Sequence, residues 1–133
     1  MAKATSNTYV NLAKEANQIS DGNDSIVIVK GLGYIPGGRT LDVSGLSSDV
    51  KVIRAGHVIF KDTDGEYKPL GVTTGAYNAL TSGQSYAGVL AHSVTVSDPR
   101  ATILTIGQVN AAASPYPITD TIKNGLPRIE FLY

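Results

Sequence analysis

The stretch AGHVIFKDTDGEYKPL, residues 55–70, decides the fold class. An apolar, partly β-branched run leads into DTDG at residues 62–65, a strong turn signal, and an aromatic and polar run follows. Two short strands joined by a hairpin turn are expected. The same turn matches the start of a calcium loop, but Glu66 comes too early to be the bidentate ligand that such a loop needs. The hairpin turn is therefore the preferred interpretation.

Short strands separated by turn signals continue on both sides of this hairpin. Upstream, the β-branched run within Ser25–Lys30 predicts a strand, and residues 31–49 look like a loop with one short strand at Thr40–Val43. Turn signals about every 8–12 residues are typical of sandwiches and barrels. We therefore expect a mainly β (β-rich α+β) fold, either a small barrel or a sandwich. The strands expected downstream are Tyr86–Ala91, Val94–Val96, Ala101–Val109 and Ile129–Tyr133.

Two short helices are expected outside the regular β region. Apolar residues at helical spacing predict the first over Thr8–Ile19. The second should run from Asp120 to Asn124, with Thr119 as its N-cap and Gly125 as a left-handed stop. The predicted plan is an arm with a short helix over residues 1–25, followed by one β-rich domain over residues 26–133.

Composition argues against several classes of function. The 133 residues suit one domain, and there is no cysteine for disulfides or thiolate metal sites. Eleven basic and eleven acidic residues leave no net charge, which does not favour binding to nucleic acid or to anionic membranes. Neither a membrane-spanning apolar run nor a signal-peptide core is present, so we expect synthesis in a cytoplasm.

The motifs that might carry catalysis have simpler explanations. The glycines of Gly31–Gly37 follow a strand as in a dinucleotide site, but the third comes one residue late and no helix is expected after it. A connecting loop is the preferred interpretation. His57 and His92 are isolated, without metal-ligand or His–carboxylate spacing. We expect no enzyme activity, no cofactor and no metal site.

Tyrosine supplies most of the aromatic side chains. Tyr34, Tyr77 and Tyr116 lie in stretches rich in Gly, Asn or Pro. Such rings often anchor contacts between proteins, and they equally often cover the edge of a core. Both interpretations stay open from the sequence.

The order of these elements resembles the head-decoration proteins of tailed phages, the lambda-type capsid-stabilising family. That family has an opening strand, a turn with an aromatic strand, two further strands, a short helix and a terminal strand. The matching stretches here are Ala55–Phe60, Gly65–Pro69, Tyr86–Ala91, Ala101–Val109, Thr119–Asn124 and Ile129–Tyr133.

A second resemblance covers more of the chain. Tyr34–Val43, Ala55–Ile59 and Ser114–Asp120 are similar to the head-fibre proteins of crAss-like phages that infect gut Bacteroidetes. A fibre should continue into a stalk after the last predicted strand, so the sequence favours a compact decoration protein. The helix at Thr8–Ile19 has no counterpart in the lambda-type proteins.

The resemblance implies a small, β-tulip-like fold and a structural role on the outer surface of a phage capsid. Such proteins reinforce the junctions between subunits, often as trimers, and an N-terminal arm adds a strand to a capsid sheet. The implied partners are the major capsid protein, further copies of the chain and other head proteins, and the implied location is the virion, after synthesis in the bacterial host. The capsid contacts are expected at Tyr9, Ile26, Val27, Ile28, Val29, Tyr34 and Arg39.

Three rival functions are kept. The chain is alternatively the base of a head fibre or a virion-displayed module that binds host glycans or receptors, with Tyr77, Tyr86 or Tyr116 in a shallow groove. A secreted adhesion domain and an enzyme rank below it.

Overall fold

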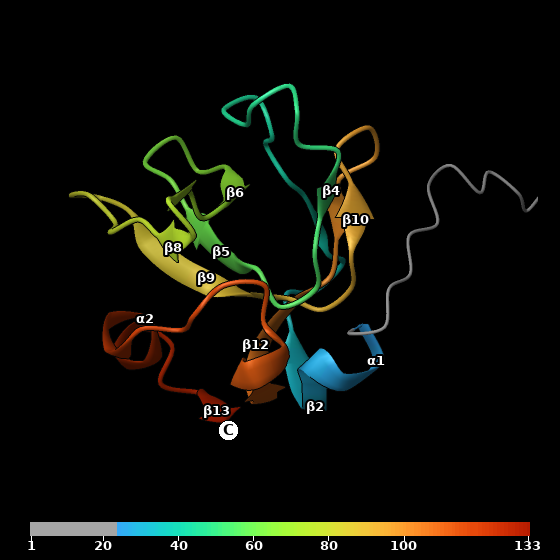
Figure 1. Ribbon diagram of the computed structural model, residues 1–133, viewed down its shortest axis with the longest axis vertical. Coiled ribbons are helices and arrows are strands. Elements are labelled where there is room, and N and C mark those ends of the chain that lie inside the picture. Colours follow the sequence, from blue (N-terminus) through green and yellow to red (C-terminus); the bar gives the residue numbers. More distant parts are fainter. Residues whose placement is uncertain (1–23) are drawn as a thin grey trace, which may run out of the picture.

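The computed structural model describes residues 24–133 (Figure 1). Its helices are α1 (Asp24–Val27), the 3-10 helix η3 (Ala111–Ala113) and α2 (Asp120–Gly125). The remaining elements are strands, and the expectation of a mainly β fold is confirmed. They are β2 (Ile28–Tyr34), β3 (Arg39–Thr40), β4 (Val52–Ile53), β5 (Val58–Lys61), β6 (Tyr67–Pro69), β7 (Val72–Thr73), β8 (Ala76–Tyr77), β9 (Ser85–Leu90), β10 (Val94–Thr95), β11 (Arg100–Ala101), β12 (Ile103–Asn110) and β13 (Ile129–Leu132).

One six-stranded sheet organises the molecule. Its order is β13–β12–β9–β5–β6, and β2 also pairs with β12. Val109 of β12 pairs with Phe131 of β13 and with Ile28 of β2, so these two strands lie on opposite edges of β12. Three two-stranded pairs, β4–β10, β3–β11 and β7–β8, complete the fold, and within residues 24–133 the sheets do not close into a barrel. The barrel alternative therefore does not hold for the described part of the chain.

The predicted hairpin at residues 55–70 is confirmed. β5 and β6 pair antiparallel, and the Gly65 N–H donates to the Asp62 carbonyl at 3.0 Å, with Gly65 at a φ of +85°. The Lys68 Nζ lies 2.8 Å from Asp62 Oδ2 and 3.3 Å from Asp64 Oδ2. The ammonium of Lys68 therefore stands beside the carboxylates that a calcium loop would turn toward its cation.

The central strands are buried on both faces because their residues alternate between two hydrophobic clusters. In β5, Val58 and Phe60 belong to one cluster and Ile59 to the other. Val89 and Leu90 of β9 divide in the same way. The first cluster also includes residues of α1, η3 and α2, whereas the second is completed by the strands β4, β10 and β11 and by Leu41. Burial on both faces explains why these strands are short continuous apolar runs.

The strand expected over Ser25–Lys30 is wrong at its beginning. The chain makes the helical turn α1 through Val27, and the strand starts at Ile28. Val27 is fully buried, and its Cγ1 lies 2.9 Å from where a Cβ at Gly56 would stand. Packing of Val27 against Gly56 thus overrides the strand preference of the run.

The glycine-rich loop expected from Gly31 is also partly wrong. Gly31 and Gly33 belong to β2, and only the segment after Tyr34 turns, with Gly37 and Gly38 at positive φ. Gly33 suits a strand because the Ile106 side chain lies 3.1 Å from the place of its missing Cβ. Close approach of a neighbouring strand explains this glycine better than a turn does.

The second helix forms as expected, but it ends differently. The Thr119 Oγ1 accepts a hydrogen bond from the Ile122 N–H at 3.3 Å, which is the predicted N-cap. Gly125 is inside the helix and does not take a left-handed conformation. It is a glycine because the Tyr86 ring occupies the position of its Cβ. The helix expected at Thr8–Ile19 lies outside the described residues.

Candidate protein-interaction surface

Exposed apolar side chains gather at one end of the described chain, on α1 and β2, which lie together in Figure 1. Within residues 26–133, five large hydrophobic side chains are exposed, and four of them fall between residues 26 and 34. A concentrated apolar patch on a soluble protein marks an interaction surface more often than scattered exposed residues do. The four exposed fractions are Ile26 49%, Val29 47%, Leu32 64% and Tyr34 43%. We call these residues, together with Lys30, the β2 edge.

The exposure follows from irregular pairing of β2 with β12. The register joins Lys30 to Gln108 and Ile28 to Val109, so Val29 has no counterpart on β12. A second shift of the same kind leaves Leu32 without a counterpart. Extra residues of this kind are β-bulges, which bend a strand and redirect its side chains. Both bulged residues are apolar and exposed.

The free side of β2 is available to a partner. Within residues 24–133, β12 is the only strand that pairs with β2. Lys30 stands opposite Gln108, and the Gln108 Nε2 donates to Glu130 Oε1 at 2.9 Å. These three side chains form a polar row across β2, β12 and β13. In the part of the chain that the structure describes, Lys30 makes no ion pair.

The residues expected to contact a capsid divide between this edge and the core. Ile26, Val29 and Tyr34 belong to the exposed edge. Val27 is fully buried, so its side chain is not open to a partner, whereas Ile28 is partly buried and packs against the first cluster. Tyr9 lies outside the described residues.

Sequence reasoning missed Leu32, the most exposed side chain of the edge. Its signal is the triplet Gly31-Leu32-Gly33. Glycines on both sides of a large apolar residue leave it without side chains at the two adjacent positions of the chain.

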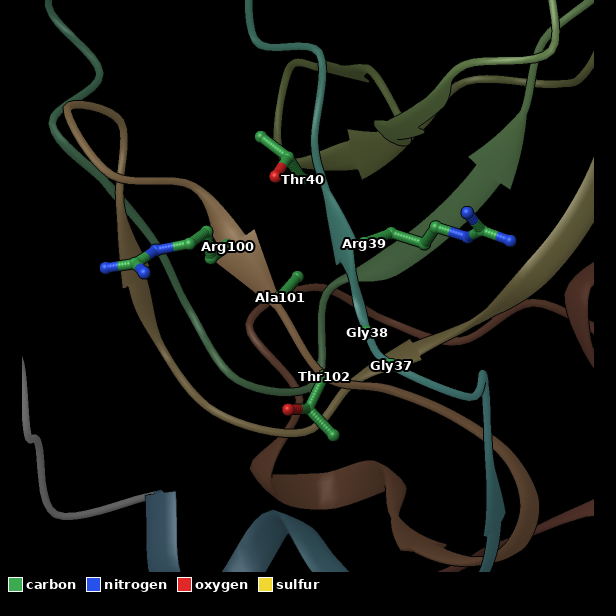
Figure 2. A pocket seen from close by; sticks show the side chains of 7 residues that line it. All are labelled: Gly37, Gly38, Arg39, Thr40, Arg100, Ala101 and Thr102. Carbon is green, nitrogen blue, oxygen red and sulfur yellow. The ribbon is translucent and has the colours of Figure 1, made fainter.

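Arg39 lies apart from the edge, beside a hollow of about 420 Å³ lined by Gly37–Thr40 and Arg100–Thr102. Figure 2 shows Arg39 and Arg100 extending in opposite directions from β3 and β11. The Arg39 guanidinium stands 5.3 Å from the centre of the Tyr67 ring, and Arg100 forms a bidentate ion pair with Asp98 at 2.7 Å. The two cations therefore do not converge on one anion.

A second concave site lies beside an aromatic cluster. The rings of His57, Tyr77 and Tyr116 meet edge to face, with centroids 5.3–5.9 Å apart. The His57 Nε2 is 2.8 Å from the Leu70 carbonyl oxygen, and the Tyr77 hydroxyl accepts from the Val58 N–H at 3.2 Å. Burial lowers the pKa of His57 and raises that of Tyr77. His57 is therefore a packed residue rather than a ligand.

The cleft beside this cluster has a volume of about 450 Å³ and mixed walls. That volume lies within the range of small-molecule sites. Most of the wall is aliphatic, and a few polar groups converge on it. The polar and aromatic lining residues are Ser47, Arg54, His57, Asn78 and Tyr116.

No group of three or more His, Cys, Asp or Glu residues within residues 24–133 is placed to hold a metal ion. The hydrogen bond from Lys68 lowers the pKa of Asp62 to about 2, and it is helped by bonds from Thr63 and Gln84. A carboxylate held ionised in this way serves the hairpin as a structural anchor.

Comparison of the chain with protein-family models, with curated proteins and with solved structures found no significant match. Among the described helices, none combines the length and the apolar character that crossing a bilayer requires.

Proposed function

We propose that the chain is a structural virion protein that binds the outer surface of a phage capsid at subunit junctions and reinforces the shell. The observation that carries the proposal is the β2 edge, which holds four of the five exposed large hydrophobic residues of the described chain, on and beside a strand that pairs only with β12 within residues 24–133. The capsid as partner comes from the sequence resemblance of residues 26–133 to phage decoration and head-fibre proteins.

Repetition on a symmetric shell suits a small patch of this kind. A decoration protein occupies many equivalent positions, and any contact it makes with further copies of itself strengthens its binding to the shell. Four apolar side chains and one lysine are a modest contact for a single site, but they suffice when neighbouring copies support one another. The major capsid protein is the proposed partner, and a homotrimer is the proposed arrangement.

Co-sedimentation with undecorated shells, before and after expansion, tests the proposal. The shells should come from the phage whose genome encodes the chain. Saturable binding with a copy number set by the symmetry of the shell is expected. If neither form of the shell binds the protein, the capsid role is excluded.

The cleft beside Tyr116 favours a second candidate function, a virion-displayed module or head-fibre base that binds host glycans. Sugars bind in shallow clefts where an aromatic ring meets amide, hydroxyl and guanidinium groups, and Tyr116, Asn78, Ser47 and Arg54 line this one. Glycan-array binding that Tyr116→Ala and Asn78→Ala abolish would support this function. An array without saturable binding would exclude it.

A further inference from the structure

The β2 edge poses the question of how a partner would dock on it. An exposed strand edge commonly binds by strand addition, in which main-chain N–H and C=O groups form a new ladder and side chains add specificity. Such a ladder requires several consecutive residues with regular spacing. The alternative is docking through side chains, which requires apolar groups that project from the strand.

The two bulges decide between these modes. Val29 and Leu32 interrupt β2, and only Lys30 and Gly31 lie between them with regular pairing on β12. Bulges bend and twist a strand, and natural sheets use them to prevent edge-to-edge pairing. A strand added to β2 would meet an interruption at every third residue. The edge is therefore poorly suited to a continuous ladder.

The same bulges present two apolar side chains three residues apart. Leu32 is 64% exposed and Val29 is 47% exposed, although both lie in a strand of the largest sheet. Leu32 is flanked by Gly31 and Gly33, so its two nearest neighbours along the chain carry no side chain. Apolar side chains that become buried in pockets of a partner stabilise the complex in proportion to the apolar area removed from water.

The charge of the edge specifies the partner further. Lys30 is exposed between the two bulges and has no ion pair within the described residues. Burying an unpaired ammonium in an interface is costly, so a fitting partner supplies a carboxylate at this place. A second copy docked about a two-fold axis that passes beside Lys30 would instead bring another lysine there.

We infer that the β2 edge docks through its side chains, with Val29 and Leu32 entering apolar pockets of the major capsid protein and Lys30 meeting a capsid carboxylate. This inference rests on the proposed function and specifies its mode. The strand addition that the resemblance implies belongs to the N-terminal arm and not to β2.

The double variant Val29→Thr/Leu32→Thr separates the two modes. Threonine is β-branched and favours strands, so the main chain keeps its conformation while the apolar surface is lost. Docking through side chains predicts at least about tenfold weaker binding to undecorated shells, because two buried apolar groups are removed. If the double variant binds within about twofold of the wild type, the inference is overturned in favour of main-chain pairing.

Charge variants test the carboxylate. Lys30→Glu should weaken binding more than Lys30→Gln does, and raising the salt concentration should reduce the difference between them. Equal binding by both variants would overturn this part of the inference. Tyr133→Ser is the matched control, because Tyr133 is 90% exposed but lies outside the edge. Circular dichroism should show that every variant is folded.

The outcomes also separate this inference from the proposed function. If the wild-type protein does not bind shells, the proposed function is overturned, and so is the capsid as the partner of this edge. Wild-type binding with an unaffected double variant overturns only the docking mode. Sedimentation velocity of the wild type tests whether a second copy is the partner of the edge. If the double variant abolishes self-association and leaves shell binding unchanged, the edge belongs to contacts between copies.

Discussion

β9 and β2 both pair antiparallel with β12, yet their apolar residues end in opposite environments. Val89 and Leu90 of β9 are fully buried, whereas Val29 and Leu32 of β2 are about half exposed or more. β9 pairs with β12 without a shift, so its alternate residues enter the two clusters. β2 shifts its register three times along the same neighbour. The comparison teaches that register, and not only apolar composition, decides whether a residue joins the core.

The largest expected effect compares a leucine from each strand. Leu90→Ala should lower the free energy of unfolding by about 2–5 kcal/mol, because it leaves a cavity in the second cluster. Leu32→Ala should change it by no more than about 0.5 kcal/mol. Urea denaturation of both variants measures the difference. Equal losses would show that Leu32 packs as tightly as Leu90 and would contradict the comparison.

A glycine from each strand gives the next contrast. A Cβ at Gly88 would overlap the Leu104 carbonyl oxygen, which belongs to the rigid main chain. Gly88→Ala should therefore destabilise the protein by about 1–3 kcal/mol. At Gly31 the Cβ would meet the end of the Tyr34 side chain, which can rotate away. Thermal unfolding should show a much smaller loss for Gly31→Ala, and the reverse order would argue against the stated packing of β9.

Two valines close together in the sequence sharpen the boundary between core and edge. Val27→Thr places a hydroxyl in the first cluster and should cost about 1–3 kcal/mol, whereas Val29→Thr should cost no more than about 0.5 kcal/mol. The same denaturation assay compares them. If Val27→Thr lowers the free energy of unfolding less than Val29→Thr does, Val27 is not the core residue of the two, and the stated boundary is contradicted.

The smallest expected effect is a pH dependence that comes from the interior. Burial beside Tyr77 and Tyr116 lowers the pKa of His57 below its ordinary value of 6.5, and this effect outweighs the hydrogen bond to the Leu70 carbonyl, which raises it. The unfolded chain then binds a proton that the folded chain does not, so stability is complete above about pH 6.5 and falls as the pH decreases, by at most about 1.4 kcal/mol per pH unit. Urea titrations at about pH 7.5 and about pH 5 measure the slope.

Histidine variants assign this slope. His57→Gln should remove it, whereas the variant His92→Gln of the exposed histidine should keep it. Asp62 does not contribute to the slope measured between these pH values. Its pKa of about 2 means that the stability it provides is lost only in more acidic solution. A slope that persists in His57→Gln would assign the titration to another group.

The sequence predicted most of the regular β structure because local signals act there without competition. The DTDG turn, the runs that became β5, β9 and β12, and the Thr119 cap each follow from residues close together in the chain. The failures lie where distant contacts decide. Val27 turns into the core because Gly56 leaves room for it, and Gly125 is a glycine because Tyr86 packs against it.

The candidate site was predicted in part for the same reason. The resemblance placed capsid contacts at Ile26–Val29, but a run of four similar residues does not show which of them face inward. The answer depends on the bulges, which arise from the register against β12, far along the chain. Leu32 was missed because its two flanking glycines indicated a loop.

Hydroxyl-radical footprinting of the protein, free and bound to undecorated shells at saturation, tests the central claim most directly, because it measures the exposure of individual side chains. Docking through the β2 edge predicts that labelling of Val29, Leu32 and Tyr34 falls on binding, while labelling of Tyr133 stays the same. Unchanged labelling of the β2 edge on fully decorated shells would contradict it.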